Sequence, residues 1–338
     1  MRWKKRPEGS NWGDFGPDDQ LGKLNLLTPE RRLEGVREVR EGLTFALSLP
    51  LDYPGGGGLV SRKPPQIQSA VRNVDDFSYN YQYSGVDPRR TDISCDDVLT
   101  LWTQYSTQWD SLAHWGSEFD ADDDGVDEIV YYNGYRGGEH IVGPGQEGGP
   151  AALALGLENA AETGVQGRAV LVDLYSTYGE ELTLVDYDGL MRAIEDRNVD
   201  VRPGDFLCIY TGWADMVLGM KKQPDPQKLT NSHAVLDGRD KRLLQWISDS
   251  GIVAIVADNL GVECINYPAE TMPQGRYSGL PLHEHCIFKQ GIILGELWQL
   301  GDLARWLRKH TRSSFLLTAP PLRMPGLVGS PVTGVATV

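Results

Sequence analysis

The sequence lacks long apolar runs and has few cysteines. No stretch of 18 apolar residues occurs, which is roughly the length that a membrane-spanning helix needs, so no transmembrane segment is predicted. The basic N-terminal residues lead into no apolar segment, so no secretory signal is expected. The four cysteines form no Cys-x-x-Cys motif: Cys95, Cys208, Cys264 and Cys286. This pattern predicts free thiols in a reducing compartment, the cytoplasm.

Positive charge is also scarce. The chain carries 32 Lys and Arg against 47 Asp and Glu, a formal charge of −15. Nucleic acids and anionic membranes bind basic surfaces, so neither is an expected partner. Apolar residues make up 40% of the chain and charged residues 23%, as in ordinary globular proteins. We expect a small-molecule substrate as the partner.

No internal repeat or linker divides the chain, so we expect a single domain over residues 1–338. It opens with an N-terminal arm, about residues 1–43, in which Thr28 caps a predicted helix that runs to Arg40. A strand is expected at 42–50. The glycines and prolines of residues 52–75 predict a long loop that leans over the pocket or onto a neighbouring subunit.

Residues 150 to 300 alternate between helical and strand patterns, which predicts an α/β layer. The segment before residue 135 is richer in short strands and long loops, and predicts an antiparallel or mixed sheet. In the α/β layer, strands are expected at 168–174, 206–210, 252–256 and 292–294, and helices at 151–163, 184–199, 241–250 and 282–290.

A polar cluster follows the apolar run at residues 98–102, which itself predicts a buried strand. The cluster has five polar residues at even spacing: Gln104, Ser106, Gln108, Asp110 and His114. On an extended chain such residues share one face, so they predict one wall of a pocket. The same spacing is also compatible with a purely structural role, in which these residues form hydrogen bonds that support the fold and take no part in a reaction.

This cluster resembles the signature of the metal-dependent cyclase family, His-x-Gly-Thr-His-x-Asp-x-Pro-x-His. Thr107, Asp110 and His114 match it, whereas Gln104 and Gln108 replace its two metal-binding histidines. Other family phrases follow in the same order: Gly-Arg-x-Val-Leu-x-Asp at 167–173, Pro-Gly-Asp-x-Leu at 203–207 and Ser-Pro-Val at 330–332. The resemblance implies the family's α/β fold, a swivelling β/β/α arrangement of a mixed sheet with flanking helices. It also implies a homo-oligomer, a dimer or a tetramer.

The resemblance further implies hydrolysis of a C–N bond in an amide, a lactam or a related ring. In the family a divalent metal polarises the carbonyl and activates water. His114 inherits the role of general acid/base, and Asp110 that of a metal ligand. Gln104 and Gln108 stand at the positions of two metal ligands of the family, but the resemblance assigns them no role of their own.

The second half of the family's site is a histidine on a short helix and a glutamate on the following strand. Glu296 matches the glutamate. The family's usual spacing, counted back from Glu296, falls on Glu284, between His283 and His285, so either histidine is a candidate ligand. A solvated polar turn is the alternative for these three residues.

The oxygen-rich donor set favours Mn²⁺ or Mg²⁺ over Zn²⁺, held weakly or absent. A metal-free lyase or cyclase that uses His114 and Glu296 as acid and base is a second hypothesis. A non-catalytic small-molecule binder on the same fold is the third. Trp109 and Trp115 suggest that the pocket accepts a flat ring, although tryptophans in such a segment can equally be core.

The acidic segment after the cluster matches half of a calcium-binding loop. Asp120, Asp122 and Asp124 stand at alternate positions before Gly125, as in an EF-hand, but the twelfth position is Tyr131. A structural Ca²⁺ site and a solvated acidic turn are both compatible with this pattern.

Overall fold

A nine-stranded mixed sheet forms the centre of the protein, in a computed structural model that describes residues 1–56, 62–73 and 76–338. The strand order is β1-β21-β19-β13-β15-β17-β18-β8-β20. The bounds are β1 Thr44–Ala46, β8 Gln108–Asp110, β13 Gln166–Asp173, β15 Phe206–Tyr210, β17 Ala254–Ala257, β18 Ile293–Glu296, β19 Ser314–Thr318, β20 Gly329–Pro331 and β21 Val335–Thr337. Strands β13, β15, β17 and β18 run parallel, whereas β8 runs antiparallel to β18.

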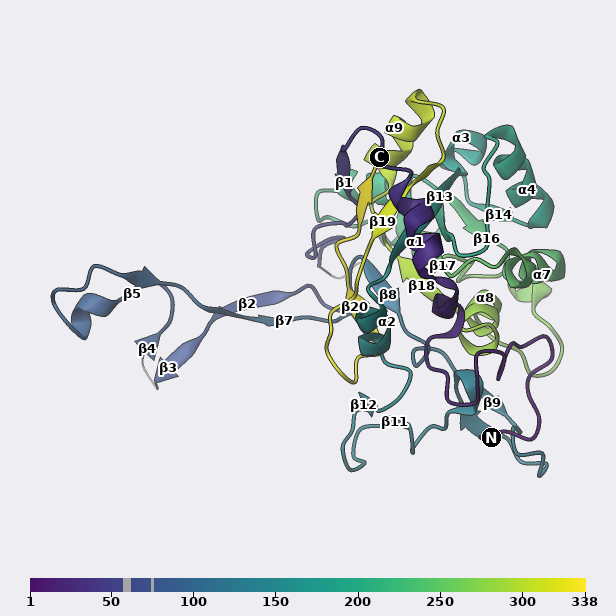
Figure 1. The fold of residues 1–338 in the computed structure, drawn as a ribbon, viewed down its shortest axis with the longest axis horizontal. Coiled ribbons are helices and arrows are strands. Elements are labelled where there is room, and N and C mark those ends of the chain that lie inside the picture. The colour runs from purple at the N-terminus through teal and green to yellow at the C-terminus, as the bar shows by residue number, and fades with distance from the viewer. Residues whose placement is uncertain (57–61, 74–75) are drawn as a thin grey trace.

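Helices flank this sheet, as Figure 1 shows. They are α1 Pro29–Val36, α2 Leu157–Thr163, α3 Tyr175–Tyr178, α4 Tyr187–Asp196, α5 Trp213–Gly219, α6 Pro226–Thr230, α7 Lys241–Ser250, α8 Pro281–His283 and α9 Gly301–Lys309, with a π-helix at Glu284–Lys289. Helix α1 packs closely on β13, because a Cβ atom at Gly35 would come within 2.6 Å of the backbone nitrogen of Arg168. This curled mixed sheet with flanking helices confirms the fold class predicted from the sequence.

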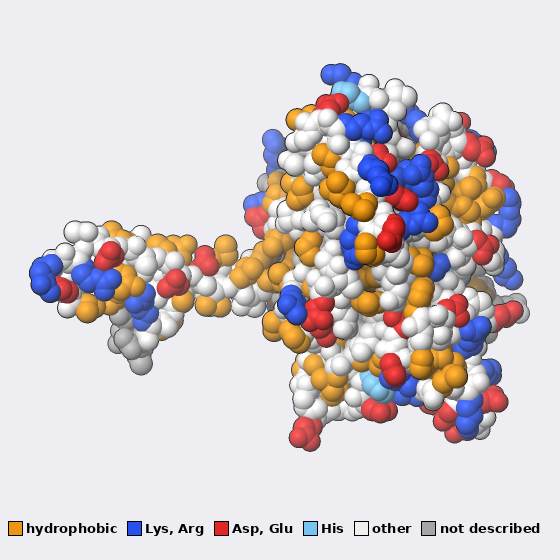
Figure 2. Space-filling model, in the orientation of Figure 1, with side chains coloured by type: hydrophobic (Ala, Val, Ile, Leu, Met, Phe, Trp, Pro, Cys, Tyr) orange, Lys and Arg blue, Asp and Glu red, His pale blue; other side chains and the backbone are white. Residues whose placement is uncertain are grey.

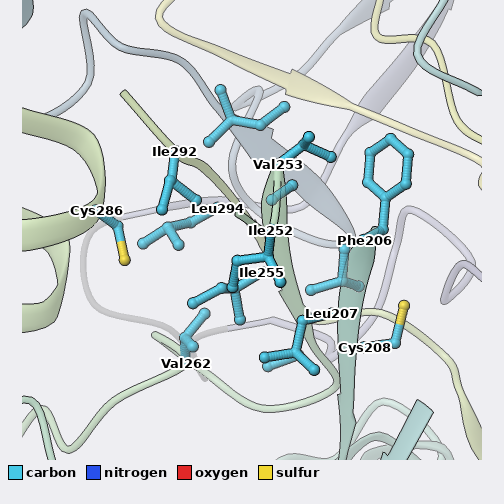
Figure 3. Close-up of a cluster of buried hydrophobic side chains, with 14 of the residues drawn as sticks. Phe206, Leu207, Cys208, Ile252, Val253, Ile255, Val262, Cys286, Ile292 and Leu294 are labelled. Atoms are coloured by element: carbon cyan, nitrogen blue, oxygen red, sulfur yellow. The ribbon is translucent and has the colours of Figure 1, made fainter. Parts of the chain in front are cut away.

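The core lies where the parallel strands are buried on both faces. Figure 3 shows side chains of β15, β17 and the segment around β18 packed together, among them Phe206, Ile255 and Leu294. Such near-continuous apolar strands are typical of a parallel sheet covered on both sides. Cys208 and Cys286 lie in this cluster, and burial raises the pKa of both thiols. None of the helices among the described residues is long and apolar enough to cross a membrane.

Among the described residues, six two-stranded ribbons lie outside the main sheet. They are β2 Gln66–Ser69 with β7 Asp97–Thr100, β3 Val71–Asn73 with β4 Asp76–Phe77, β5 Tyr81–Gln82 with β6 Ile93–Ser94, β9 Ser117–Phe119 with β10 Glu128–Val130, β11 Ile141–Val142 with β12 Ala151–Ala152, and β14 Thr183–Val185 with β16 Ala234–Leu236. The first three ribbons form an extension that projects away from the body (Figure 1). The main sheet therefore lies in the body, whereas the extension carries these three ribbons and the 3₁₀ helix Tyr83–Gly85.

Two sequence-based predictions are wrong in this region. The apolar run at 98–102 is not a buried strand, because β7 is exposed along its whole length in the extension. The predicted loop at 52–75 contains β2 and β3 in its second half. Its residues 57–61 and 74–75 lie outside the described residues.

Helix boundaries also differ from prediction in informative ways. The helix expected at 184–199 begins at Tyr187, because the side chain of Asp186 accepts a hydrogen bond from Gly189 N and caps it. Residues 183–185 form strand β14, in which Thr183 pairs with Ala234. The helix after Thr28 begins as predicted but ends at Val36.

Candidate functional site

The candidate site is built on β8, which lies between β18 and β20 in the sheet. Gln108 pairs with Glu296 across the β8–β18 ladder, and Asp110 pairs with Leu294. Paired residues and residues two apart on a strand share a face, so Gln108, Asp110 and Glu296 lie together. All three are almost fully buried, and Gln108 Nε2 donates a hydrogen bond to Glu296 Oε2 at 2.9 Å.

Trp109 faces the other side of the same strand. Its ring packs against Trp298 with centroids 4.9 Å apart, and its Nε1 donates to the carbonyl of Ala319 at 2.9 Å. The residue is fully buried in the core. The prediction that Trp109 contacts substrate is therefore wrong, because strand alternation points its side chain away from Asp110.

His283 reaches the site from the end of α8, where it is fixed by Glu263. Glu263 Oε1 accepts hydrogen bonds from the backbone nitrogen and Nδ1 of His283, both at 2.8 Å, and its Oε2 accepts from Leu282 N at 2.9 Å. The other ring nitrogen, Nε2, points to Glu296 Oε1 at 3.1 Å. A carboxylate behind a histidine in this way sets its ring orientation.

His285 does not belong to the site. Its Nε2 lies 2.9 Å from Ser248 Oγ on α7, and burial lowers the pKa of its imidazole to about 4. The two histidines stand at the junction of α8 with the π-helix, and only His283 faces the sheet residues. The choice that the sequence left open between His283 and His285 therefore falls on His283.

Gln104 and His114 approach Asp110 from the turns on either side of β8. Gln104 Nε2 hydrogen-bonds Asp110 Oδ1 and lies 3.1 Å from His114 Nδ1. His114 Nε2 lies 3.9 Å from Asp110 Oδ1. Only residues 108–110 are extended, so these side chains converge through turns and not through the even spacing of one long strand. Gln104 therefore contacts both the carboxylate of Asp110 and the imidazole of His114.

Three ionisable side chains meet at the centre of the site. Asp110, His283 and Glu296 each offer a ligand atom, and these atoms lie within 4.8 Å of one another. Among the described residues, the buried atoms Asp110 Oδ2 and Gln108 Oε1 have no hydrogen-bond partner. Buried polar atoms are normally satisfied, and an unpaired carboxylate oxygen and an unpaired amide oxygen on one face of β8 are the kind of ligands that a cation binds.

The electrostatics of the three groups differ. Burial raises the pKa of Asp110. Burial would also raise the pKa of Glu296, but its hydrogen bond and charge interaction with His283 lower it overall. For His283, burial acts against the charged form, yet the hydrogen bonds to Glu263 and Glu296 raise its pKa to about 10. Of the two carboxylates in the cluster, Glu296 therefore interacts more strongly with the His283 imidazole. For Asp110, burial is the dominant effect on the pKa.

Trp115 borders the site on the side of a large cavity. Its ring centroid lies 5.3 Å from that of His283 and 6.0 Å from that of His114. The cavity, about 800 Å³, is lined by Trp115, the β9 residues, the loop at 275–279 and Lys289. Asp110 and His283 do not line this cavity, whereas Trp115 lines it and also lies beside His283.

The acidic segment forms the loop of the β9–β10 hairpin. Carboxylate oxygens of Asp120, Asp122 and Asp124 lie within 4.8 Å of one another. Asp120 also accepts hydrogen bonds from the backbone nitrogens of Asp124 and Gly125, at 3.0 and 3.1 Å. The calcium site stays a prediction, since these bonds would shape the loop with or without a cation.

Sequence reasoning missed Glu263 and Arg62. Glu263 is a single carboxylate within the apolar run 260–265 that follows β17. This pattern indicates a buried charged side chain, which is normally paired with a specific partner. Arg62 donates from Nη1 to the carbonyl oxygen of Gln104 at 2.6 Å and so joins the base of the extension to the site. No local motif marks Arg62.

Comparisons with known proteins agree with this architecture. Residues 45–264 match the Cyclase family model, described as "Putative cyclase". No curated protein sequence matches significantly. A solved structure described as a novel cyclase is 30% identical, with a TM-score of 0.75 over 97% of this chain and 99% of its own.

Isatin hydrolases share the fold at lower identity. Isatin hydrolase A from Ralstonia solanacearum is 15% identical, with a TM-score of 0.54 over 87% of this chain and 91% of its own. An isatin hydrolase bound to the product analogue thioisatinate is 14% identical, with a TM-score of 0.55 over 92% and 99%. The family match over most of the chain, together with the solved cyclase, shows that this chain belongs to the cyclase family.

Proposed function

We propose that this chain is a metal-dependent hydrolase that cleaves a C–N bond in an amide, a lactam or a related ring. The observation that carries the proposal is the meeting of Asp110, His283 and Glu296 within 4.8 Å in a buried position. The unpaired oxygens of Asp110 and Gln108 lie at the same place. A buried cluster of this kind is a metal site in which the protein supplies most of the ligands.

The residues fit a divalent cation. Asp110, Glu296 and His283 Nε2 would hold it, with Gln108 Oε1 as a weaker neutral ligand. Three oxygen donors and one nitrogen favour Mn²⁺ or Mg²⁺ over Zn²⁺, and the neutral amide favours weak binding. Bound there, the cation would polarise the substrate carbonyl and acidify a water molecule.

His114 is the group placed to move a proton. It lies at the edge of the cluster, is partly exposed, and is fixed by Gln104 on one side. In this role it takes a proton from the attacking water and gives one to the leaving nitrogen. Trp115 offers a flat wall beside both histidines, which suits a planar ring substrate.

One observation favours the metal-free alternative. His283 faces carboxylates with both ring nitrogens, Glu263 at 2.8 Å and Glu296 at 3.1 Å. A doubly protonated imidazole satisfies both contacts and places a positive charge where the cation would otherwise lie. In that case His114 and Glu296 would act as acid and base without metal.

Metal analysis separates these hypotheses. Protein purified without chelators is assayed for Mn²⁺, Mg²⁺ and Zn²⁺ by mass spectrometry and for activity on a panel of cyclic and acyclic amides, including isatin. We expect activity that chelation abolishes and Mn²⁺ restores, and an Asp110→Asn variant that has lost both metal and activity. The exposed Asp302→Asn variant is the matched control. Activity that survives exhaustive chelation would favour the metal-free reaction, and tightly held stoichiometric zinc would contradict the predicted metal preference.

A further inference from the structure

Gln104 and Gln108 present opposite ends of their amides to the polar cluster. Gln108 Nε2 donates to Glu296 Oε2, and its buried Oε1 has no hydrogen-bond partner among the described residues. Gln104 instead hydrogen-bonds Asp110 Oδ1 through its nitrogen, Nε2. Gln108 therefore has an oxygen to offer to a cation, whereas Gln104 presents a hydrogen-bond donor, which a cation does not bind.

The contact with Asp110 determines which end of the Gln104 amide faces the cluster. An ionised carboxylate, the form that binds a cation, only accepts hydrogen bonds, so an amide oxygen at this place would face another acceptor. The Gln104 oxygen lies next to Gly329, where an added Cβ atom would come within 3.0 Å of it. The amide is therefore oriented with its nitrogen toward Asp110.

The same nitrogen also contacts the imidazole of His114. Gln104 Nε2 lies 3.1 Å from Nδ1 and 3.4 Å from Nε2 of the ring. The carboxylate and the imidazole are farther from each other, since His114 Nε2 lies 3.9 Å from Asp110 Oδ1. An amide nitrogen carries two hydrogens, so Gln104 links the two groups and sets the distance between them.

Gly329 on β20 leaves the space that the Gln104 side chain occupies. A Cβ atom at residue 329 would come within 2.3 Å of Gln104 Cγ and 2.5 Å of Cδ. Gly329 pairs with Asp110 in the β8–β20 ladder, which holds its backbone in place. Its φ angle lies outside the left-handed region, so the backbone itself would accept another residue. A side chain at 329 would therefore displace the Gln104 side chain.

Arg62 holds the backbone of Gln104. Its Nη1 donates to the carbonyl oxygen of Gln104 at 2.6 Å. Arg62 precedes β2, where the extension leaves the body as a narrow arm (Figure 2). Gln104 is thus fixed at both its backbone and its side chain, as the supporting residues of a preorganised site are.

We propose that Gln104 is a positioning residue, which holds the Asp110 carboxylate and the His114 imidazole in the arrangement that the reaction uses, and that Gly329 makes room for it. The proposal rests on the proposed function, in which His114 transfers the proton. Gln104 occupies Asp110 Oδ1, and Oδ2, unpaired within the described part of the chain, remains free for a cation. A side chain that supports a metal ligand in this way is typically worth about 10- to 100-fold in metal affinity or activity.

The test is a double-mutant cycle between residues 104 and 329. Gln104→Ala removes the amide together with the atoms that a methyl group at 329 would meet. Gly329→Ala displaces the amide while every polar side chain of the cluster is kept. Gly219→Ala in α5, where an added Cβ atom meets nothing within 4 Å, is the matched control. Circular dichroism confirms that each variant is folded.

We expect each single variant to lower kcat on the best amide of the panel about 10- to 100-fold, with KM changed less than about threefold. In the double variant Gly329→Ala should add nothing, because the side chain that it displaces is already absent. Losses that multiply in the double variant would show that Gly329 acts without Gln104 and overturn the proposal. A wild-type kcat in Gln104→Ala would overturn it as well.

Titration of metal-free protein with Mn²⁺ separates a positioning residue from a ligand. Gln108→Ala removes the unpaired amide oxygen and should raise the Kd for Mn²⁺ more than Gln104→Ala does. A larger rise in Gln104→Ala would make Gln104 a ligand and overturn the proposal.

The ring signals of the histidines give a measurement that needs neither substrate nor metal. The chain has six histidines, and NMR of metal-free protein with labelled imidazole rings follows each of them, with the His114 signal assigned by its loss in His114→Asn. Gln104→Ala and Gly329→Ala should both shift this signal and leave that of the exposed His310 unchanged. An unshifted His114 signal in both variants would overturn the positioning role. A wild type that cleaves no amide, with the shifts present, would count against the proposed function and leave the contact between Gln104 and His114 confirmed.

Discussion

Glu263 is the residue on which the position of His283 depends. Its two carboxylate oxygens accept from two backbone nitrogens at the start of α8 and from the imidazole Nδ1. It is fully buried, so its charge is available only to these partners. The side chain of Glu263 therefore fixes both the start of α8 and the orientation of the His283 ring.

Replacing Glu263 by Gln should weaken metal binding about 10- to 100-fold, because the amide holds the ring less firmly and makes it less basic. Titration calorimetry with Mn²⁺ on metal-free protein measures the change. Glu284→Gln, next to His283 but outside the cluster, is the control. Equal Mn²⁺ affinity in the wild type and Glu263→Gln would show that Glu263 supports the fold and not the metal.

His114→Asn should fold normally and lose about 10²- to 10⁴-fold in kcat, because it removes a positioned proton-transfer group. His310→Asn, an exposed histidine on the far end of α9, controls for the substitution itself. Turnover at the wild-type rate on the best substrate would remove His114 from the mechanism.

The sequence located much of the site but not its packing. Asp110, His114 and Glu296 could be placed because a family signature fixes their spacing. Trp109 could not be distinguished from Trp115, since the sequence does not show that Trp109 lies on β8 with its side chain in the core whereas Trp115 follows the strand and lies beside His283. Glu263 could not be found from a motif, because its role arises from the fold that brings residues 263 and 283 together.

At the scale of elements, prediction succeeded where periodicity and caps agree. The strand at 206–210 and the helix at 241–250 are confirmed residue for residue. The prediction of a buried strand at 98–102 failed because an apolar β-branched stretch looks the same in a buried strand and in an exposed one such as β7.

The π-helix at Glu284–Lys289 explains the uncertain register of the histidine. A π-turn holds one residue more than an α-helical turn. One extra residue between the histidine and Glu296 is the offset that separates His283 from the position expected at Glu284. Counting along the chain could not detect this, because sequence spacing does not show which turn is widened.

The acidic loop should bind Ca²⁺ if its three carboxylates act together. Binding to the folded state would raise the Tm with increasing Ca²⁺ by the usual linkage. Asp122→Asn should abolish the rise, because Asp122 Oδ1 is buried without a partner among the described residues. Asp188→Asn, on the surface of α4, should not. A Tm independent of Ca²⁺ would leave the loop as a solvated turn.

At the scale of the whole molecule, Asp258 makes stability depend on pH. Its carboxylate joins β17 to the turn after β15 by accepting from Thr211 and Gly212, but complete burial outweighs these bonds and raises its pKa to about 7. The folded state thus binds the proton more tightly than the unfolded chain. The stability that Asp258 contributes through this proton is fully present below about pH 4. It is lost as the pH rises through 7, which lowers the free energy of unfolding by at most about 4 kcal/mol.

Urea unfolding at pH 5 and pH 8 tests this expectation. The decrease in the free energy of unfolding between the two pH values should be smaller in Asp258→Asn than in the wild type, whatever the absolute stability of the variant. The exposed Asp302→Asn should keep the wild-type decrease. An identical pH dependence in Asp258→Asn would show that this carboxyl is ionised throughout the range.

The order of strands in the sheet has a consequence for synthesis. Among the described residues, strand β8, which carries Asp110, lies between β18 and β20, and β1 joins the sheet through β21. Both partners lie within residues 329–337, more than 200 residues after β8. During translation the segment that holds the candidate site therefore waits, with one edge open, until residue 331 has left the ribosome, and β1 waits for β21. The chain is committed to folding this site late, and a nascent chain stalled before residue 329 would expose that edge to chaperones.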